Sequence, residues 1–344
     1  MARIRRERAA HHSAPGVTSP ASQRGLQWLA ATLALVLAPL SVAGAVYLAF
    51  VHDEAGPSRS SEAPASPVGP VTPRGPAPGG SLEPRSPAPI RLTGVDAFAV
   101  KLRKAPRAAL VFDVDNGEVL YRRDPARSRP MASLTKIMTA LVVVRETQPE
   151  DRVRITDAAL RYQGSGVGVL PKGKEVRLET LLNGLMLVSG NDAAIALAGH
   201  VSGDERRFVR LMNEKARLWG LTCTHFASSH GLEDGNRSCP ADLAVLTRLA
   251  MRNERIARIV RRPQVSFRFP IKGGRLYLGG HNPLLRTRYP GAIGLKTGYT
   301  NTAGRCFVGV ARRRGRALGV VLLNSPNPAV QAAKLLDLGF ASSG

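Results

Sequence analysis

Hydrophobic positions in the C-terminal part of the chain follow strand-like spacing at both ends and helix-like spacing between them. Two apolar segments, Ala108–Asp113 and 118–122, flank Asp115-Asn116-Gly117, which is a strong hairpin signal. Helical spacing occurs in four segments, 178–188, 193–201, 208–218 and 241–251. Strand patterns return at 293–299, 306–311 and 318–323, before a last helix at about 329–338. This order predicts an α+β fold in which helices face an antiparallel sheet, rather than alternating βαβ units.

The first part of the chain has a different pattern. After a basic segment, residues 1–25, the segment 26–51 runs for 26 residues without a charge, which exceeds the roughly 20 residues needed to span a bilayer. The arginines before it predict a single-pass signal-anchor helix with the N-terminus inside and the rest of the chain outside the cell. Ala43-Gly44-Ala45 reads as a small-residue cleavage site, so secretion after cleavage near Ala45 is the alternative.

Residues 52–93 have the composition of a linker. Ten of the 25 prolines lie between Pro57 and Pro89, interleaved with Gly, Ser and Ala. Such a segment cannot bury enough apolar surface to offset its ordering entropy, and we expect a disordered, extended spacer. The globular domain is therefore expected to cover 94–344.

The positive charge belongs mostly to this predicted domain. The formal net charge is +24; residues 1–93 hold nine Lys/Arg and five Asp/Glu, giving +4, and the remainder holds 40 and 20, giving +20. This balance favours either an anionic polymer, nucleic acid or cell envelope, or a merely solvated arginine-rich surface. No zinc-type cysteine pattern, Walker loop or nucleic-acid motif is present. We therefore expect no cofactor, no metal and no nucleic-acid partner.

The strongest candidate chemistry lies at Ser133-Leu134-Thr135-Lys136, which opens a long apolar run after Pro130. Pro ahead of such a run predicts a helix start, and on a helix Ser133 and Lys136 share a face. That geometry suits a serine nucleophile and a lysine base, with the helix N-terminus favouring developing negative charge. Alone, the pattern is weak, because a helix-capping Ser and a solvated Lys are commoner.

Two further motifs strengthen the catalytic interpretation of this pattern. Ser189-Gly190-Asn191 lies between two helical stretches, and Lys296-Thr297-Gly298 ends a predicted strand. S-x-x-K, then S-x-N, then K-T-G is the set of serine acyl-transferases that include penicillin-binding proteins and β-lactamases. A second S-x-N match, Ser325-Pro326-Asn327, follows the K-T-G motif and is out of order. All three motifs in order, each in its expected context, form a specific signal.

From about residue 96 to the end, the chain resembles the D-alanyl-D-alanine carboxypeptidases, the low-molecular-weight penicillin-binding proteins. Segments 132–140, 189–194 and 294–300 are similar to that family's three motifs, and 224–226 and 230–232 to the segment between the second and third. The resemblance implies a β-lactamase/penicillin-binding-protein-like fold, with a five-stranded antiparallel sheet flanked by helices and a helical subdomain. It also implies a bacterial extracytoplasmic enzyme that acts on peptidoglycan stem peptides and is inhibited by β-lactams.

The resemblance implies three catalytic residues. Ser133 would attack the carbonyl carbon of the penultimate D-alanine, and water would then hydrolyse the acyl-enzyme. Lys136 would be the base, with its pKa depressed by burial and by the nearby Lys296. Ser189 would relay a proton to the leaving amine.

The same resemblance implies the substrate-binding residues. Asn191 would hold a substrate amide, while Lys296 and Thr297 would meet the terminal carboxylate. Gly298 would keep the strand edge open to a substrate lying alongside it. The backbone N–H groups of Tyr299 and of the nucleophile would form the oxyanion hole.

The cysteines and histidines receive other expectations. Because an exported domain sits in an oxidising compartment, we predict a disulfide between Cys223 and Cys239, with Cys306 free. Closing about 15 residues contributes roughly 3 kcal/mol in the entropic description. His225 and His230 have no clear triad partner and are not expected to be catalytic.

Two alternative functions are left open by the sequence. A class A-like β-lactamase needs a Glu that activates the deacylating water, and no Glu-x-x-Leu-Asn segment lies between Asn191 and Lys296; Glu233 is in the wrong context. A non-catalytic envelope-binding protein would use the basic surface alone. The presence of all the catalytic side chain types favours the carboxypeptidase.

Overall fold

The structure is a computed structural model that describes residues 90–342. The predicted basic segment 1–25, the predicted membrane helix 26–51 and nearly all of the predicted linker 52–93 lie outside the described residues. Within 90–342, no helix is both long and apolar enough to cross a membrane.

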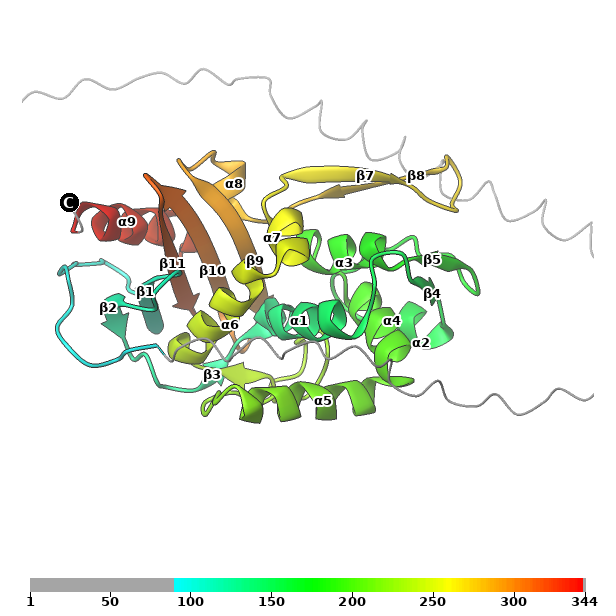
Figure 1. Cartoon of the computed structure of the whole chain (residues 1–344), viewed down its shortest axis with the longest axis horizontal. Helices are drawn as coiled ribbons and strands as arrows, with labels where there is room; N and C mark the ends of the chain where they lie inside the picture. Colours follow the sequence, from blue (N-terminus) through cyan, green and yellow to red (C-terminus); the bar gives the residue numbers. More distant parts are fainter. Residues whose placement is uncertain (1–89, 343–344) are drawn as a thin grey trace, which may run out of the picture. The chain divides into compact units, whose positions relative to one another are not determined.

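A five-stranded antiparallel sheet forms the centre of the domain, with the strand order β2-β1-β11-β10-β9 (Figure 1). Its strands are β1 (Ala108–Asp113), β2 (Val119–Arg123), β9 (Ala292–Thr300), β10 (Gly304–Arg313) and β11 (Arg316–Leu323). The first and last thirds of the chain therefore meet in one sheet, because β1 pairs with β11. The predicted α+β fold is confirmed, and β9, which carries the third motif, is an edge strand.

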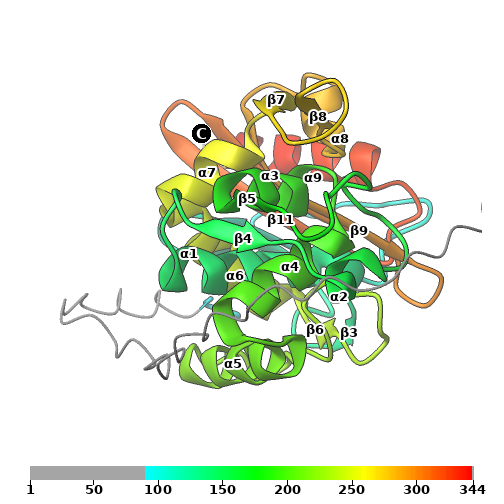
Figure 2. The same cartoon turned by 90° about the vertical axis from the view of Figure 1, so that its right-hand side faces the viewer.

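Helices cover both faces of this sheet. The helices are α1 (Lys136–Glu146), α2 (Asp157–Leu160), α3 (Leu178–Leu187), α4 (Asn191–Ser202), α5 (Glu205–Leu218), α6 (Pro240–Arg252), α7 (Glu254–Val260), α8 (Pro283–Arg286) and α9 (Pro328–Ala341). One face packs against α8 and α9, and the other against α6 and α7, which lead to the helical part built on α1, α3 and α4. In both views α5 lies along the lower edge of the domain (Figures 1 and 2).

Three short two-stranded ribbons were not predicted. They are β3–β6 (Arg129–Pro130 and Arg237–Ser238), β4–β5 (Arg152–Arg154 and Glu175–Arg177) and β7–β8 (Gln264–Arg268 and Arg275–Gly279). The first two have strands of only two or three residues, which are too short for a periodic signal. Each ribbon adds a surface outside the main sheet.

The predicted hairpin at Asp115-Asn116-Gly117 is present, and a buried arginine supports it. Asp113 Oδ1 accepts hydrogen bonds from the backbone N–H groups of residues 115 and 116, and Gly117 has a φ of +83°. Arg248 of α6 is 1% exposed and donates from Nε to the backbone oxygen of Val114. A Cβ at Gly117 would lie 2.6 Å from an Arg248 guanidinium nitrogen, so the turn requires glycine for two reasons.

Candidate active site

Ser133 lies in a tight turn that precedes the helix rather than in the helix itself. Residues Ala132–Thr135 form the 3₁₀ turn η1, and α1 begins at Lys136. The sequence predicted that the helix starts here, whereas in the structure this turn comes first and the α-helix follows it. Ala132 has a φ of +49°, a left-handed conformation that is unfavourable for alanine, immediately before the nucleophile candidate. Backbone strain of this kind concentrates at functional sites.

The amine of Lys136 contacts three oxygen atoms from three separate parts of the chain. Its Nζ lies 3.1 Å from Ser133 Oγ, 2.7 Å from Asn191 Oδ1 and 2.6 Å from the backbone oxygen of His230. A neutral amine has two N–H donors and one lone pair, and this set matches them. The two N–H groups meet Asn191 and His230, and the lone pair is left for the hydroxyl proton of Ser133.

Burial favours that neutral form. Lys136 is fully buried, and its pKa is lowered well below the usual value, first by burial and then by the positive charge of Lys296. Desolvation outweighs the attraction of Asp192 and Glu233, which acts in the opposite direction. A deprotonated Lys136 beside a serine hydroxyl is a general base in position.

The second motif brings Ser189 and Asn191 to the same place at the start of α4. Ser189 is 6% exposed, has a φ of +61°, and its hydroxyl makes no hydrogen bond among residues 90–342. That leaves the hydroxyl available to a substrate. Asn191 is fixed on both sides, because its Nδ2 donates to the backbone oxygen of Gln163 while its Oδ1 accepts from Lys136.

The neighbouring Asp192 anchors the loop at residues 167 and 168 to the start of α4. Its carboxylate accepts hydrogen bonds of 2.9 Å from the backbone N–H groups of Val167 and Gly168, and one from Ala193. Asp192 is not the cap of α4, because the N-cap residue is Gly190 and no side chain caps it. Its bonds to a loop 24 and 25 residues earlier were not foreseen.

The third motif lies on β9, directly against η1. Lys296 is 1% exposed, and burial lowers its pKa to about 7. A Cβ added at Gly298 would lie 3.1 Å from the backbone nitrogen of Ser133, a tight contact that a side chain there would relieve only by moving the strand or the turn apart by a few tenths of an ångström. Thr297 is partly exposed, and Tyr299 is 63% exposed at the open edge. The structure thus brings all three motifs together.

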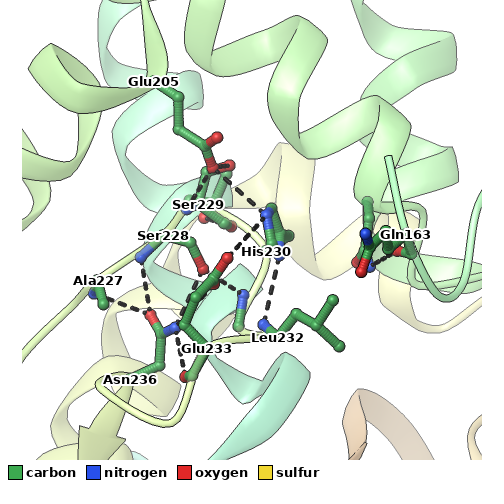
Figure 3. Close-up of polar contacts among 12 residues, drawn as sticks. Gln163, Glu205, Ala227, Ser228, Ser229, His230, Leu232, Glu233 and Asn236 are labelled. Atoms are coloured by element: carbon green, nitrogen blue, oxygen red, sulfur yellow. Dashed lines mark hydrogen bonds and ion pairs between the residues drawn. The ribbon is translucent and has the colours of Figure 1, made fainter. Parts of the chain in front are cut away.

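The loop that supplies the His230 carbonyl was missed as part of the site, and Figure 3 shows the polar network that holds it. Asn236 Nδ2 donates to Ser228 Oγ, which in turn accepts from the backbone of Gly231. The His230 Nε2 atom lies 3.7 Å from carboxylate oxygens of both Glu205 and Glu233. The imidazole is therefore engaged with these two carboxylates, and it is the backbone oxygen of His230 that contacts Lys136.

Gly231 seats the loop against the nucleophile turn. It has a φ of +87°, and a Cβ there would collide with the backbone oxygen of Ala132 and lie 2.7 Å from Thr135 Oγ1. The sequence signal was the His-Gly pair itself, which indicates a backbone conformation rather than a side-chain role.

The expected disulfide between Cys223 and Cys239 is present, and Cys306 is free and buried. Asp242 lies beside the disulfide and accepts a hydrogen bond from the backbone N–H of Cys223. Because both sulfur atoms are bonded to each other, they supply no thiolate for a metal. Burial raises the pKa of the Cys306 thiol to about 11, which keeps it protonated and unreactive.

Comparison with known proteins agrees with this geometry. The family model for peptidase S11, D-alanyl-D-alanine carboxypeptidase, matches residues 98–327. The D-alanyl-D-alanine carboxypeptidase DacB2 of Mycobacterium tuberculosis is 42% identical over 241 residues, covering 67% of this chain and 81% of its own. DacF of Bacillus subtilis is 31% identical over 250 residues, which is 70% of this chain and 64% of DacF.

Solved structures show the same fold. A D-alanyl-D-alanine carboxypeptidase from M. tuberculosis superposes with a TM-score of 0.67 at 38% identity, covering 72% of this chain and 96% of that one. The DD-transpeptidase of Streptomyces K15 superposes with a TM-score of 0.66 at 32% identity, covering 71% of this chain and all of that one. With three motifs joined around one buried lysine and two-thirds of the chain matched, the protein belongs to the D-alanyl-D-alanine carboxypeptidase family, the low-molecular-weight penicillin-binding proteins of peptidase family S11.

Proposed function

We propose that Ser133 removes the terminal D-alanine from peptidoglycan stem peptides through an acyl-enzyme. The observation that carries this assignment is the contact between Lys136 Nζ and Ser133 Oγ, with the amine fully buried. Lys136 takes the hydroxyl proton as Oγ bonds to the carbonyl carbon of the penultimate D-alanine. The C–N bond then breaks: Ser189 gives its hydroxyl proton to the leaving amine and takes up the proton that Lys136 accepted. Water hydrolyses the ester to restore Ser133.

The substrate is oriented by β9. Its edge position leaves the strand free on one side, so a peptide can lie alongside as an added strand. The terminal carboxylate meets the Lys296 ammonium and the Thr297 hydroxyl, which lie next to each other on this strand. The close approach of Gly298 to Ser133 supports an oxyanion hole made by the backbone N–H groups of Ser133 and Tyr299.

The direct test is release of D-alanine from a model peptide ending in D-Ala-D-Ala. Ser133→Ala should abolish release, while Ser325→Ala, at the S-x-N match outside the site, should leave it intact. The Ser325 hydroxyl bonds to Gln331 of α9 and to none of the motif residues. Release that persists in Ser133→Ala would assign the nucleophile elsewhere.

We further propose that the protein is held in a bacterial cell membrane by residues 26–51, with the enzyme domain outside. The support is the 26-residue charge-free run and the basic segment before it. Fractionation of cells should leave the intact protein in the membrane until detergent is added. A mature form that begins at Val46 would instead indicate cleavage after Ala45 and secretion.

A further inference from the structure

A basic groove lies between the β4–β5 ribbon and the tip of the β7–β8 hairpin, which projects above that ribbon in Figure 1. It has a volume of about 790 Å³ and is open to solvent. Its charged lining comprises Arg152, Arg154, Lys174, Arg268 and Arg275, against one carboxylate, Glu175. None of the motif residues lines it, so the groove is separate from the catalytic residues.

The register of both ribbons places arginines directly opposite each other. Arg268 pairs with Arg275 across β7–β8, and Arg152 pairs with Arg177 across β4–β5. Like charges at directly opposite positions destabilise a strand pair. The Arg268–Arg275 pair is exposed and lines the groove, so a bound anion would relieve its repulsion; on the other ribbon Arg154 is opposite Glu175.

None of these cations is neutralised by a carboxylate within the described domain, although Arg152 donates to the backbone oxygen of Glu175 and Arg275 to Ser266 Oγ. Among residues 90–342, the side chains of Arg154, Lys174 and Arg268 form no ion pair or hydrogen bond, and none of the five lining cations forms an ion pair. Other arginines of the domain do pair with carboxylates, as Arg255 does with Glu179. The groove cations are therefore free to meet an external anion, and guanidinium groups suit carboxylate and phosphate oxygens in paired contacts.

We propose that this groove binds an anionic wall polymer, a chain carrying repeated carboxylate or phosphodiester groups. Several cations spread along a hollow match a chain with repeated charges better than a single small anion. Tyr277, 73% exposed, lies on the same face of β8 as Arg275 and offers a ring for a sugar face.

The position of the groove gives it a use in the reaction. Its ribbons pack on α3 and α4, the two helices joined by the Ser189 motif. A polymer held there would keep the enzyme close to the wall without entering the catalytic site. The effect is on local substrate concentration, so release of D-alanine from a small soluble peptide should not depend on the groove.

The test compares two triple variants that each remove three positive charges. Arg154→Gln/Arg268→Gln/Arg275→Gln removes three of the five groove cations, and Arg206→Gln/Arg210→Gln/Arg217→Gln removes three from α5, along the lower edge of the domain, as the matched control (Figure 1). Binding to sodium polygalacturonate and to poly(glycerol phosphate) is measured at 0.1 M salt, with neutral dextran as the blank. The groove variant should bind about tenfold more weakly than wild type, and the α5 variant about as well as wild type.

Activity on a small peptide separates this proposal from the proposed function, because both variants should retain wild-type D-alanine release. A second measurement uses the unmodified protein: bound polymer should protect Arg154, Arg268 and Arg275 from phenylglyoxal, as read by peptide mapping. Preference for one polymer would identify carboxylate or phosphodiester as the anion. Equal weakening in the two variants, equal binding to single-stranded DNA, binding only to phosphatidylglycerol vesicles, or unprotected groove arginines would each overturn the proposal.

Discussion

The amine of Lys136 donates a hydrogen bond of 2.6 Å to the backbone carbonyl oxygen of His230, 94 residues later in the chain. One of the two N–H groups of the neutral base is thereby fixed by a loop rather than by another motif. The direction of the lone pair toward Ser133 then depends on where that loop lies. The loop at His230 is therefore a positioning element of the site.

This relationship predicts a large effect for Gly231→Ala. The new Cβ would collide with Ala132 and displace either the loop or the nucleophile turn. Since a misplacement of about 1 Å can cost roughly 10²-fold in rate, kcat should fall by about that factor. Gly220→Ala is the matched control, because Gly220 also has a positive φ of +68° but a Cβ there meets nothing within 4 Å. Equal kcat in the two variants would contradict a positioning role.

A second prediction concerns the pH dependence of kcat/KM. The Lys296 ammonium must be charged to bind the substrate carboxylate, and its pKa in the free enzyme is lowered to about 7. Above that pH the charge is lost, so kcat/KM should decline on the alkaline side. In Lys296→Arg the guanidinium stays charged, and the decline should move to higher pH. An alkaline limb that is the same in both proteins would assign it to another group.

Burial of Lys296 also makes the free energy of unfolding depend on pH. Between about 7, its folded pKa, and its usual 10.5, the unfolded chain holds a proton on Lys296 that the folded protein does not. The free energy of unfolding should therefore rise with pH across this window through this group. Lys296→Met removes this titrating group. In urea unfolding at several pH values, the free energy of unfolding of the variant should change less with pH than that of wild type. A variant with an unchanged slope would indicate that the ammonium is solvated in the folded state.

The central strands and the three motifs could be predicted because each produces a recognisable pattern in consecutive residues. Alternation gave β9, β10 and β11, and short patterns with fixed spacing placed Ser133 and Lys296 in order. That the three motifs form one site followed only from the resemblance to a known family. In the structure, the pairing of β1 with β11 brings the two ends of the domain into one sheet.

Other parts of the site have no such local signature. The His230 carbonyl is a backbone atom, and its use depends on a fold that brings it to Lys136. The bonds of Asp192 to the loop at 167 and 168 likewise span two elements. The left-handed conformation of Ser189 could not be expected from a serine, which rarely adopts it.

A last prediction concerns β-lactams, which resemble the D-Ala-D-Ala terminus and carry a strained amide. Ser133 should open the ring and keep the whole molecule as an ester, because the leaving group stays tethered and hinders water. Glu233, the glutamate weighed as a water activator, is instead placed beside His230 and Asn236. The adduct should therefore persist and appear as a mass increase of one penicillin on the peptide that contains Ser133.

Lys136→Ala should slow labelling by about 10²–10⁴-fold, since it removes the base, while Lys172→Ala, at an exposed surface ion pair, should not change it. Rapid turnover of penicillin by the wild type would contradict a persistent adduct and favour a β-lactamase activity.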